Sequence, residues 1–299
     1  MKNEKEQATP AVQTADQGGD SGYTDCAVPL DKRERWPSMT FAWFGAAMFV
    51  GLYYTGVELG SSMGTLSNAL IAIIGGGVFL AGFVMLNGII GYKTGCTAAL
   101  IGRYSYGSRG AAIPSFHITD IGNNIMSTAQ LAVILSAIVP AIDAKVFCIF
   151  CSILFLTNSF IGFKAMVVLN KVAMPILLFT GLYGLFRLHV ITDGGLPAVF
   201  GYENDATIAI SAGVTIVVGT WISGSSRAAD YFRFSKSMKD TVIAAFAGFF
   251  SGLIICLVVA AFWGAGLGNS EIVPTLMTLG GGMMFFGFVM FTLQTWTTN

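Results

Sequence analysis

One stretch decides the fold: Val217-Val218-Gly219-Thr220-Trp221-Ile222-Ser223-Gly224-Ser225-Ser226. It lies in a segment that is otherwise apolar enough to cross a membrane, yet it carries two glycines, four hydroxyl side chains and a tryptophan. Unwound backbone is tolerated at membrane depth only where it is buried in protein or lines a cavity. The stretch therefore predicts an interrupted transmembrane helix with a binding site at the interruption.

The whole chain has the composition of an all-α polytopic membrane protein. Hydrophobic residues make up 54% of its 299 residues and charged residues only 11%, and the mean hydropathy is +0.71. A water-soluble domain of this length could not bury so much apolar surface. The 16 basic residues balance the 16 acidic ones, so a basic nucleic-acid-binding face has no support. The pair Cys148-x-x-Cys151 lies in an apolar segment, which favours buried thiols over a zinc or redox site.

Eight apolar segments approach or exceed the roughly 20 residues that cross a bilayer. They are expected at 37–59, 67–92, 112–140, 146–168, 170–191, 207–229, 240–267 and 275–299. All but two of the basic residues precede the first segment or follow the second, fourth and sixth; the two are Lys145 and Arg187. The positive-inside rule therefore predicts a multi-pass protein of the inner or plasma membrane with a cytoplasmic N-terminus.

The polar parts of the chain are predicted to lie in the cytoplasm. Residues 1–35 are rich in Gln, Asp, Gly, Lys and Glu and have no apolar period, so they predict a disordered tail. Their charged start runs into a polar stretch, and no signal peptide is expected. The loop after the second segment, around residues 91–115, is predicted to form a short helix with turns under the bundle.

The first segment resembles the sixth in being rich in small residues near its middle, where it reads Gly45-Ala46-Ala47-Met48-Phe49-Val50-Gly51. The two are five segments apart and enter from opposite sides, as expected for an inverted pair of broken helices that each open a five-helix repeat. The alternative is close packing of unbroken helices through small residues, whereas Gly75-Gly76-Gly77 and Gly280-Gly281-Gly282 are interpreted as packing sites or bends. The predicted domains are a first repeat at 36–191 and a second, incomplete repeat of three helices at 192–299.

The third segment carries an internal polar set. At about 100° per residue, most of its members share one helix face, which should look into the bundle because lipid would make it costly. Binding and plain interhelical hydrogen bonding both remain open for Asn124 and Ser127, whereas the ionisable Asp120 favours a function. The set comprises His117, Asp120, Asn123, Asn124, Ser127 and Thr128.

Several motifs together resemble the cytosine permease branch of the nucleobase:cation symporter family, the purine/cytosine permeases. They are Gly91-x-Lys93-Thr94-Gly95-x-Thr97, Arg103-Tyr104-Ser105-Tyr106-Gly107, Pro114-Ser115, Gly219-x-x-Ile222-Ser223, Asp230-x-x-Arg233-Phe234 and Trp296-Thr297-Thr298-Asn299. The resemblance implies an inverted five-plus-five transporter fold of twelve helices. It also implies uptake of a nucleobase or related heterocycle with sodium or protons, and no other cofactor.

The resemblance also implies which residues bind. The sodium site would use main-chain oxygens near Gly45, Phe49 and Gln294 with the hydroxyls of Thr297 and Thr298. The substrate site would use Gly219, Thr220, Trp221 and Ser223, with Trp221 stacking on a flat ring.

The third segment departs from the family pattern. The family places a glutamine and a tryptophan where this chain has Gly122 and Ile125. The nearby Asp120, Asn123 and Asn124 can supply other polar contacts, so a heterocycle other than cytosine is the hypothesis.

Two rival functions remain. The chain stops at Asn299 inside or just after the eighth segment, which is expected of a fragment, a truncated product or a non-transporting receptor. An intramembrane enzyme could use His117 and Asp120, but the only other histidine is His189 and no ligand constellation accompanies them.

Overall fold

The computed structural model describes residues 23, 26–111, 118–155, 163–203 and 206–298. In this part of the chain the regular elements are helices, joined by two isolated bridges, Glu34 to Ser235 and Thr65 to Glu203. The elements are η1 (Leu30–Lys32), α1 (Trp36–Ala47), α2 (Val50–Ser62), α3 (Leu66–Thr94), α4 (Ala98–Gly110), α6 (Ile118–Ile138), α7 (Ala144–Phe155), α9 (Phe163–Ile191), α10 (Gly195–Val199), α11 (Ile210–Ser226), α12 (Ala228–Phe232), α13 (Met238–Ala244), the π-helix η2 (Ala245–Phe250), α14 (Ser251–Leu267), α15 (Ile272–Leu279) and α16 (Met283–Thr298).

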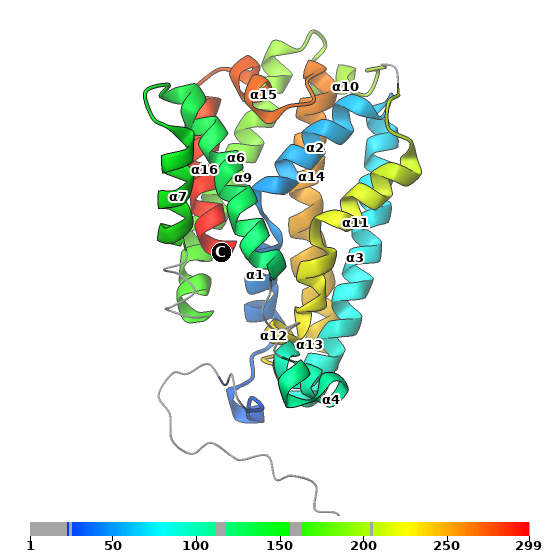
Figure 1. Ribbon diagram of the computed structural model, residues 1–299. Coiled ribbons are helices and arrows are strands. Elements are labelled where there is room, and N and C mark those ends of the chain that lie inside the picture. The colour runs from blue at the N-terminus through cyan, green and yellow to red at the C-terminus, as the bar shows by residue number, and fades with distance from the viewer. Residues whose placement is uncertain (1–22, 24–25, 112–117, 156–162, 204–205, 299) are drawn as a thin grey trace, which may run out of the picture.

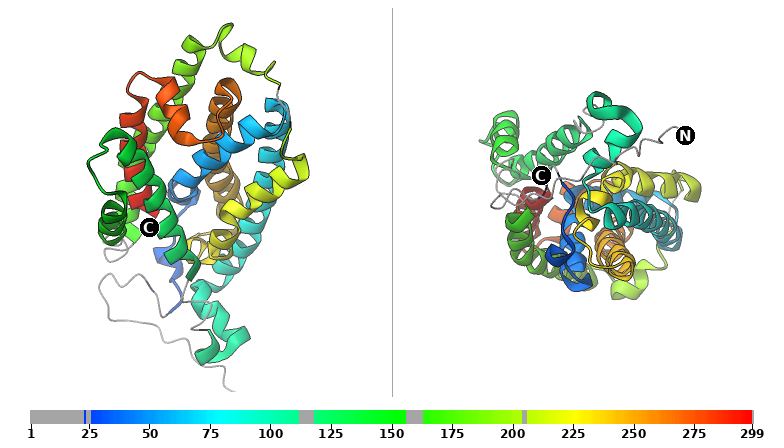
Figure 2. Two further views of the ribbon diagram at one scale, coloured as in Figure 1. Left: turned by 45° about the horizontal axis from the view of Figure 1, so that its top comes forward. Right: turned by 90° about the horizontal axis from the view of Figure 1, so that it is seen from below.

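The long helices form two groups that lie side by side (Figure 1). The first helix group contains α1, α2, α3, α11, α12, α13 and α14, and the second helix group contains α6, α7 and α16. Helix α9 packs against α1 and α14 of the first group and against α16 of the second. Figure 2, seen from below, places the red α16 on the opposite side from α3 and α14. At the junction between the groups, α16 contacts α1 and α2.

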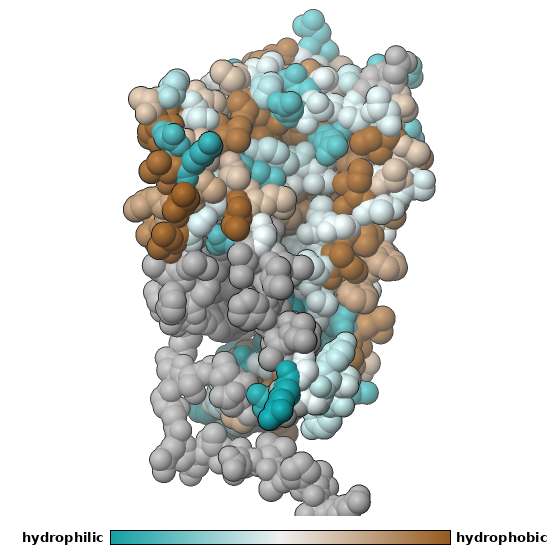
Figure 3. Space-filling view, in the orientation of Figure 1, coloured by the Kyte–Doolittle hydropathy of each residue, from teal (hydrophilic) through white to brown (hydrophobic). Residues whose placement is uncertain are grey.

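The described helices account for the eight apolar segments, although only some are full spans. Leu66–Thr94, Val172–Ile191 and Met238–Leu267 are long and apolar enough to cross a membrane, and the bent pair α1 and α2 can form a fourth span. The shorter apolar helices are Asn124–Ile138, Ala144–Phe155, Ile210–Ser226 and Met283–Trp296. Hydrophobic side chains gather on both flanks of the molecule, and the rim above them is more hydrophilic (Figure 3).

The first span is broken, as its sequence predicts. Helices α1 and α2 meet at an angle of 62°. Between them Met48 (φ −81°, ψ 113°) and Phe49 (φ −142°, ψ 158°) have extended backbone. Glycine is required at position 51, because a Cβ there would overlap the Phe49 ring. Two extended residues thus leave helix-end amides and carbonyls free for other partners in the middle of the span.

The interruption predicted within residues 217–226 is not observed there. Helix α11 runs unbroken to Ser226, and the chain turns one residue later, at Arg227 (φ −95°, ψ 11°). The hydroxyls do not unwind the helix because they bond back to it: Thr220 Oγ1 donates to the Val217 carbonyl at 2.6 Å, and Ser226 Oγ to the Ser223 carbonyl at 2.5 Å. The stretch is therefore an unbroken helix, as the alternative expects, although Gly219 itself makes no close helix contact.

The glycine runs behave as packing sites and bends. Gly76 lies inside α3, and an added Cβ would come within 2.7 Å of the Val217 side chain, so it lets α3 approach α11 closely. Gly280, Gly281 and Gly282 all have positive φ and form the turn between α15 and α16. The eighth segment, expected to be continuous from residue 275, is therefore divided at this turn.

The boundary predicted between the fourth and fifth segments, at residues 168–170, is wrong. Helix α9 is continuous from Phe163 to Ile191, and α7 ends at Phe155. The connection between them falls in residues 156–162, which lie outside the described residues. The sequence is apolar on both sides of residue 169, so it gave no signal that would place the connection at 156–162 instead of at 168–170.

Residues 26–35, which the sequence assigns to the predicted tail, make defined contacts with the rest of the molecule. The Val28 amide donates to the Gly95 carbonyl at 2.9 Å. Glu34 pairs with the α12–α13 connection: its amide donates to the Phe234 carbonyl at 2.6 Å, and its carbonyl accepts from the Lys236 amide at 2.8 Å. These bonds fix residues 26–35 against the ends of α3 and α12.

Two arginines add side-chain bonds at this end of the molecule. Arg33 Nη1 donates to the Tyr92 carbonyl at 2.7 Å, and Arg233 Nη1 donates to the Tyr23 carbonyl at 2.6 Å. Desolvation by burial lowers the pKa of both guanidinium groups. The predicted short helix after the second span is also present as α4, whose first amide, that of Ala98, donates to Asp230 Oδ1 at 2.7 Å.

Candidate functional site

The break in the first span is bound by one side chain of α16. The Val50 amide donates to Gln294 Oε1 at 2.8 Å, and Gln294 Nε2 donates to the Met48 carbonyl. Gln294 is only 2% exposed. One primary amide thus serves both a donor and an acceptor that the extended residues leave without helical partners.

A second side chain reaches the break from α11. Trp221 Nε1 donates to the Ala47 carbonyl, the last of α1, at 3.1 Å. The rings of Phe49 and Phe249 lie 5.6 Å from the Trp221 ring and nearly perpendicular to it, at 84° and 88°. Neither of these two neighbours stacks in parallel on the indole. The break therefore combines polar backbone atoms with an aromatic cluster where α1, α2, α11 and α16 meet.

The other predicted substrate residues of α11 are not brought to the break. Gly219 and Ser223 are exposed, and an added Cβ at Gly219 would meet nothing within 4 Å. In a helix, positions 219 and 223 share a face while position 221 lies about 200° away from 219. Thr220 lies between these faces, half-buried, with its hydroxyl bonded to its own helix. Because α11 is continuous, it points Trp221 inward and Gly219 and Ser223 outward.

Helix α6 supplies buried polar groups but uses part of them for packing. Thr128 Oγ1 lies 2.9 Å from Ser152 Oγ of α7 and donates to the Asn124 carbonyl at 2.8 Å, so Thr128 serves interhelical bonding. Asn124 is 7% exposed, and its Nδ2 has no hydrogen-bond partner among the described residues. Gly122 and Ile125, at the positions where the family pattern differs, are exposed. Asp120 and Asn123 belong to α6, but their side chains, like the whole of His117, lie outside the described residues.

The predicted sodium ligands lie near the same break, as far as the structure describes them. Gly45 is buried in α1, Phe49 is part of the break, and Gln294 contacts it. The Phe49 carbonyl accepts from the Leu52 amide at 3.0 Å. Thr297 and Thr298 belong to α16, three and four residues after Gln294, and their side chains lie outside the described residues. Main-chain and hydroxyl oxygens are the hard donors that suit a small cation, so the donor chemistry fits sodium.

The prediction included Gln294 only for its main-chain oxygen, and its side-chain contact was missed. An amide side chain in an otherwise apolar segment is the signal that could have found it, because a polar group at membrane depth needs a partner. A metal site built from His, Cys, Asp and Glu has no support in the described part of the chain, where no group of three or more such residues could hold a metal ion.

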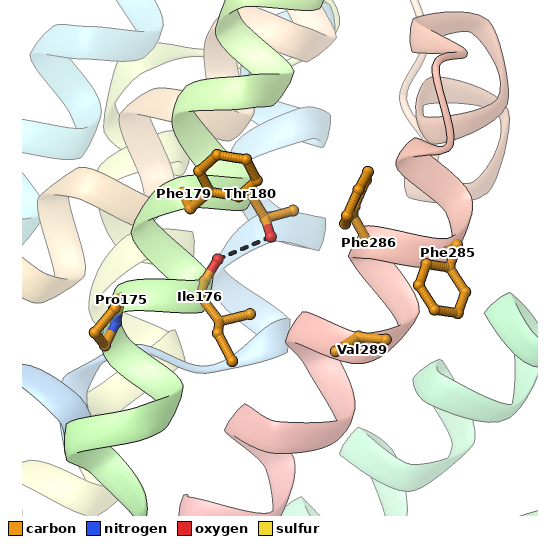
Figure 4. A pocket seen from close by; sticks show the side chains of 7 residues that line it. All are labelled: Pro175, Ile176, Phe179, Thr180, Phe285, Phe286 and Val289. Atoms are coloured by element: carbon orange, nitrogen blue, oxygen red, sulfur yellow. Dashed lines mark hydrogen bonds between the residues drawn. The ribbon is translucent and has the colours of Figure 1, made fainter.

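A separate hollow lies between α9 and α16 (Figure 4). The hydroxyl of Thr180, its only polar side chain, donates to the Ile176 carbonyl at 2.8 Å. This hollow therefore offers no free polar group that could read a heterocycle. Its lining residues are Pro175, Ile176, Phe179, Thr180, Phe285, Phe286 and Val289.

Comparison with known proteins places this architecture. A family model described as a permease for cytosine/purines, uracil, thiamine and allantoin matches residues 28–299. The chain belongs to this permease family. Among curated relatives, the cytosine permease of Escherichia coli (strain K12) is 27% identical over 282 residues, which cover 94% of this chain and 66% of that protein. The chain thus spans about two thirds of the length of the relatives it matches.

Solved structures show that the chain has the fold of known transporters. The first is Mhp1, a nucleobase-cation-symport-1 family transporter, closed with bromovinylhydantoin bound; it has a TM-score of 0.80 and 19% identity, over 92% of this chain and 65% of that one. The inward-facing conformation of Mhp1 has a TM-score of 0.75 and 19% identity, over 91% of this chain and 63% of that one. A sodium-coupled sialic acid symporter has a TM-score of 0.68 and 11% identity, over 90% of this chain and 63% of that one.

These comparisons confirm the family resemblance and the all-helical transporter fold. The permease is a multi-pass membrane protein and belongs to a transporter family, not to an enzyme family. The intramembrane enzyme based on His117 and Asp120 is therefore set aside.

Proposed function

We propose that this permease takes up a planar nitrogen heterocycle of the nucleobase type together with a cation, by alternating access to the break in its first span. The observation that carries the proposal is the contact of Trp221 with the break, where its indole bonds to the Ala47 carbonyl and its ring meets the ring of Phe49. A flat ring needs an aromatic wall and a polar edge, and this junction offers both. Asn124, buried in α6 with no partner for its Nδ2 among the described residues, is a candidate for a further polar contact.

The cation, sodium in the first instance, would be held by main-chain oxygens near Gly45, Phe49 and Gln294 with the hydroxyls of Thr297 and Thr298. These donors come from α1 and α16, which belong to different helix groups. A cation between them favours one arrangement of the two groups, and a substrate that binds the same arrangement is then bound more tightly. A proton is the alternative coupling ion, and Asp120 is the first residue to mutate in that case.

The proposal is tested by uptake into cells that lack their own nucleobase permeases. Labelled cytosine, hypoxanthine and related heterocycles should accumulate when the protein is expressed, and replacing external sodium by choline at fixed pH should reduce accumulation. If uptake is unchanged in choline, the coupling ion is the proton and not sodium. Binding without uptake would favour a receptor, and the absence of both for every heterocycle would overturn the proposal.

The role of Trp221 has its own test. Replacing a stacking aromatic by alanine costs about 1–3 kcal/mol per base, so Trp221→Ala should weaken heterocycle binding by about 5-fold to 150-fold. Equilibrium binding to the purified protein measures the change. Trp263→Ala, a substitution of a buried tryptophan outside the proposed site, is the matched control. Equal affinity of the wild type and Trp221→Ala would contradict the stacking role.

A further inference from the structure

Among the described residues, the side-chain amide of Gln294 bonds to backbone on both sides of the break in the first span. Its Oε1 accepts from Val50, the first residue of α2, and its Nε2 donates to Met48, the residue after α1. The pair of bonds fixes where α2 begins relative to α1. A side chain that made only one of them would leave the other backbone group buried and unsatisfied, which is costly.

This contact also joins the two helix groups. Gln294 belongs to α16 of the second helix group, whereas Met48 and Val50 belong to the first. Two helix groups that move against each other as rigid bodies must either carry this amide pair along or break it. The hydrogen bonds of Gln294 at the break therefore depend on how the two helix groups are arranged.

The same residue lies next to the proposed cation ligands. Thr297 and Thr298 follow it by three and four residues, which places all three on one face of α16. Any shift of α16 that brings these oxygens around a cation also moves the Gln294 side chain. Because that side chain holds the extended residues, the shift is passed to the backbone beside Trp221.

We propose that the Gln294 side chain is a positioning residue that couples the cation site to the heterocycle site. It acts through the backbone of Met48 and Val50 and need not contact either ligand. The proposal rests on the proposed function and deepens it. It predicts that the residue matters for the effect of the cation on substrate affinity more than for either affinity alone.

The coupling is measured as the ratio of heterocycle affinities with and without the cation in purified wild type and Gln294→Leu. Sodium is compared with choline at fixed pH, and two pH values are compared in choline, so that either coupling ion is covered. Coupling between sites is commonly 5-fold to 150-fold, and we expect a ratio of about 10 in the wild type that falls toward 1 in Gln294→Leu. Gln130→Leu is the same substitution at a half-buried glutamine of α6, and it should keep the wild-type ratio.

Gln294→Glu separates positioning from a general loss of packing. A protonated carboxyl group has one donor and one acceptor, like the amide it replaces, whereas a carboxylate can only accept. The coupling ratio of Gln294→Glu should therefore be low at high pH and recover as the pH falls. A purely structural role predicts the same ratio at every pH after correction for the wild-type profile, and that result would overturn the proposal.

Hydrogen exchange tests the contact without any ligand. The Val50 amide should be protected in wild type and Gln130→Leu and should exchange faster in Gln294→Leu. Equal protection in all three would overturn the positioning role, even if the proteins transport. If the wild type binds no heterocycle, the proposed function fails while this measurement still decides whether Gln294 sets the break. Faster exchange with an unchanged coupling ratio would restrict Gln294 to the fold and refute the coupling.

Discussion

At the scale of single residues, the break in the first span shows which side chains bond to backbone groups that have no helical partner. The sequence identified Trp221 as an aromatic in a small, polar stretch and Gln294 as a neighbour of the threonines. Their partners, the carbonyls of Ala47 and Met48, could not be predicted, because they depend on where α1 ends. The exposed position of Ser223 could not be predicted for a related reason: it follows from a continuous α11, which the hydroxyl-rich composition argued against, and the binding role of Ser223 stays a prediction.

The bond from Trp221 to Ala47 can be tested separately from binding. Trp221→Phe keeps an aromatic ring but leaves a helix-end carbonyl without its donor, so the free energy of unfolding should fall by about 1–3 kcal/mol. Denaturation in detergent measures the loss. Trp263→Phe is the control, because the Trp263 Nε1 has no partner among the described residues and only ring volume is lost there. Equal losses in the two variants would mean that the Ala47 bond contributes nothing.

At the scale of elements, small residues decide how closely the helices pack. Gly60 of α2 and Gly264 of α14 each face backbone of the other helix: their added Cβ atoms would overlap the carbonyls of Ala261 and Val57. The sequence could locate most of these helices, since apolar runs are strong signals. It could not assign each glycine run to packing, to a turn or to a break, because all three use the same residue.

Gly60→Ala should therefore destabilise the protein, since α2 and α14 must move apart to admit the methyl group. Overpacking of this kind typically costs about 1–3 kcal/mol. Gly82→Ala is the control: an added Cβ there meets nothing within 4 Å, and alanine in a helix should be neutral or stabilising by up to about 1 kcal/mol. Thermal unfolding of both variants measures the difference. A melting temperature for Gly60→Ala at or above that of Gly82→Ala would show that the interface can relax.

At the scale of the whole molecule, the family motifs predicted the transporter fold, and the comparisons confirm it. The apolar runs predicted eight segments but not their grouping, because contacts between α2 and α14 or α3 and α11 join residues far apart in the sequence. The orientation in the membrane is still a prediction from loop charge. The two ends of the molecule, with α4 at one and α15 at the other, allow it to be measured (Figure 1).

Single cysteines at the two ends should label from opposite sides. In a chain whose native cysteines are replaced by serine, Tyr104→Cys on the exposed face of α4 should react with a membrane-impermeant thiol reagent only after the cells are permeabilised. Ser270→Cys, before α15, should react on intact cells. The reverse pattern would place the N-terminus outside.

The segment that leads into α1 has a consequence for the order of assembly during synthesis. The Trp36 amide bonds to Asp240, 204 residues later, and Tyr23 accepts from Arg233, 210 residues later. A ribosome adds about 5–20 residues per second, so the segment is made roughly 10–40 seconds before its partners exist. The segment that leads into α1 therefore leaves the ribosome before its partners, and it reaches its final position only after α12 and α13 have been made.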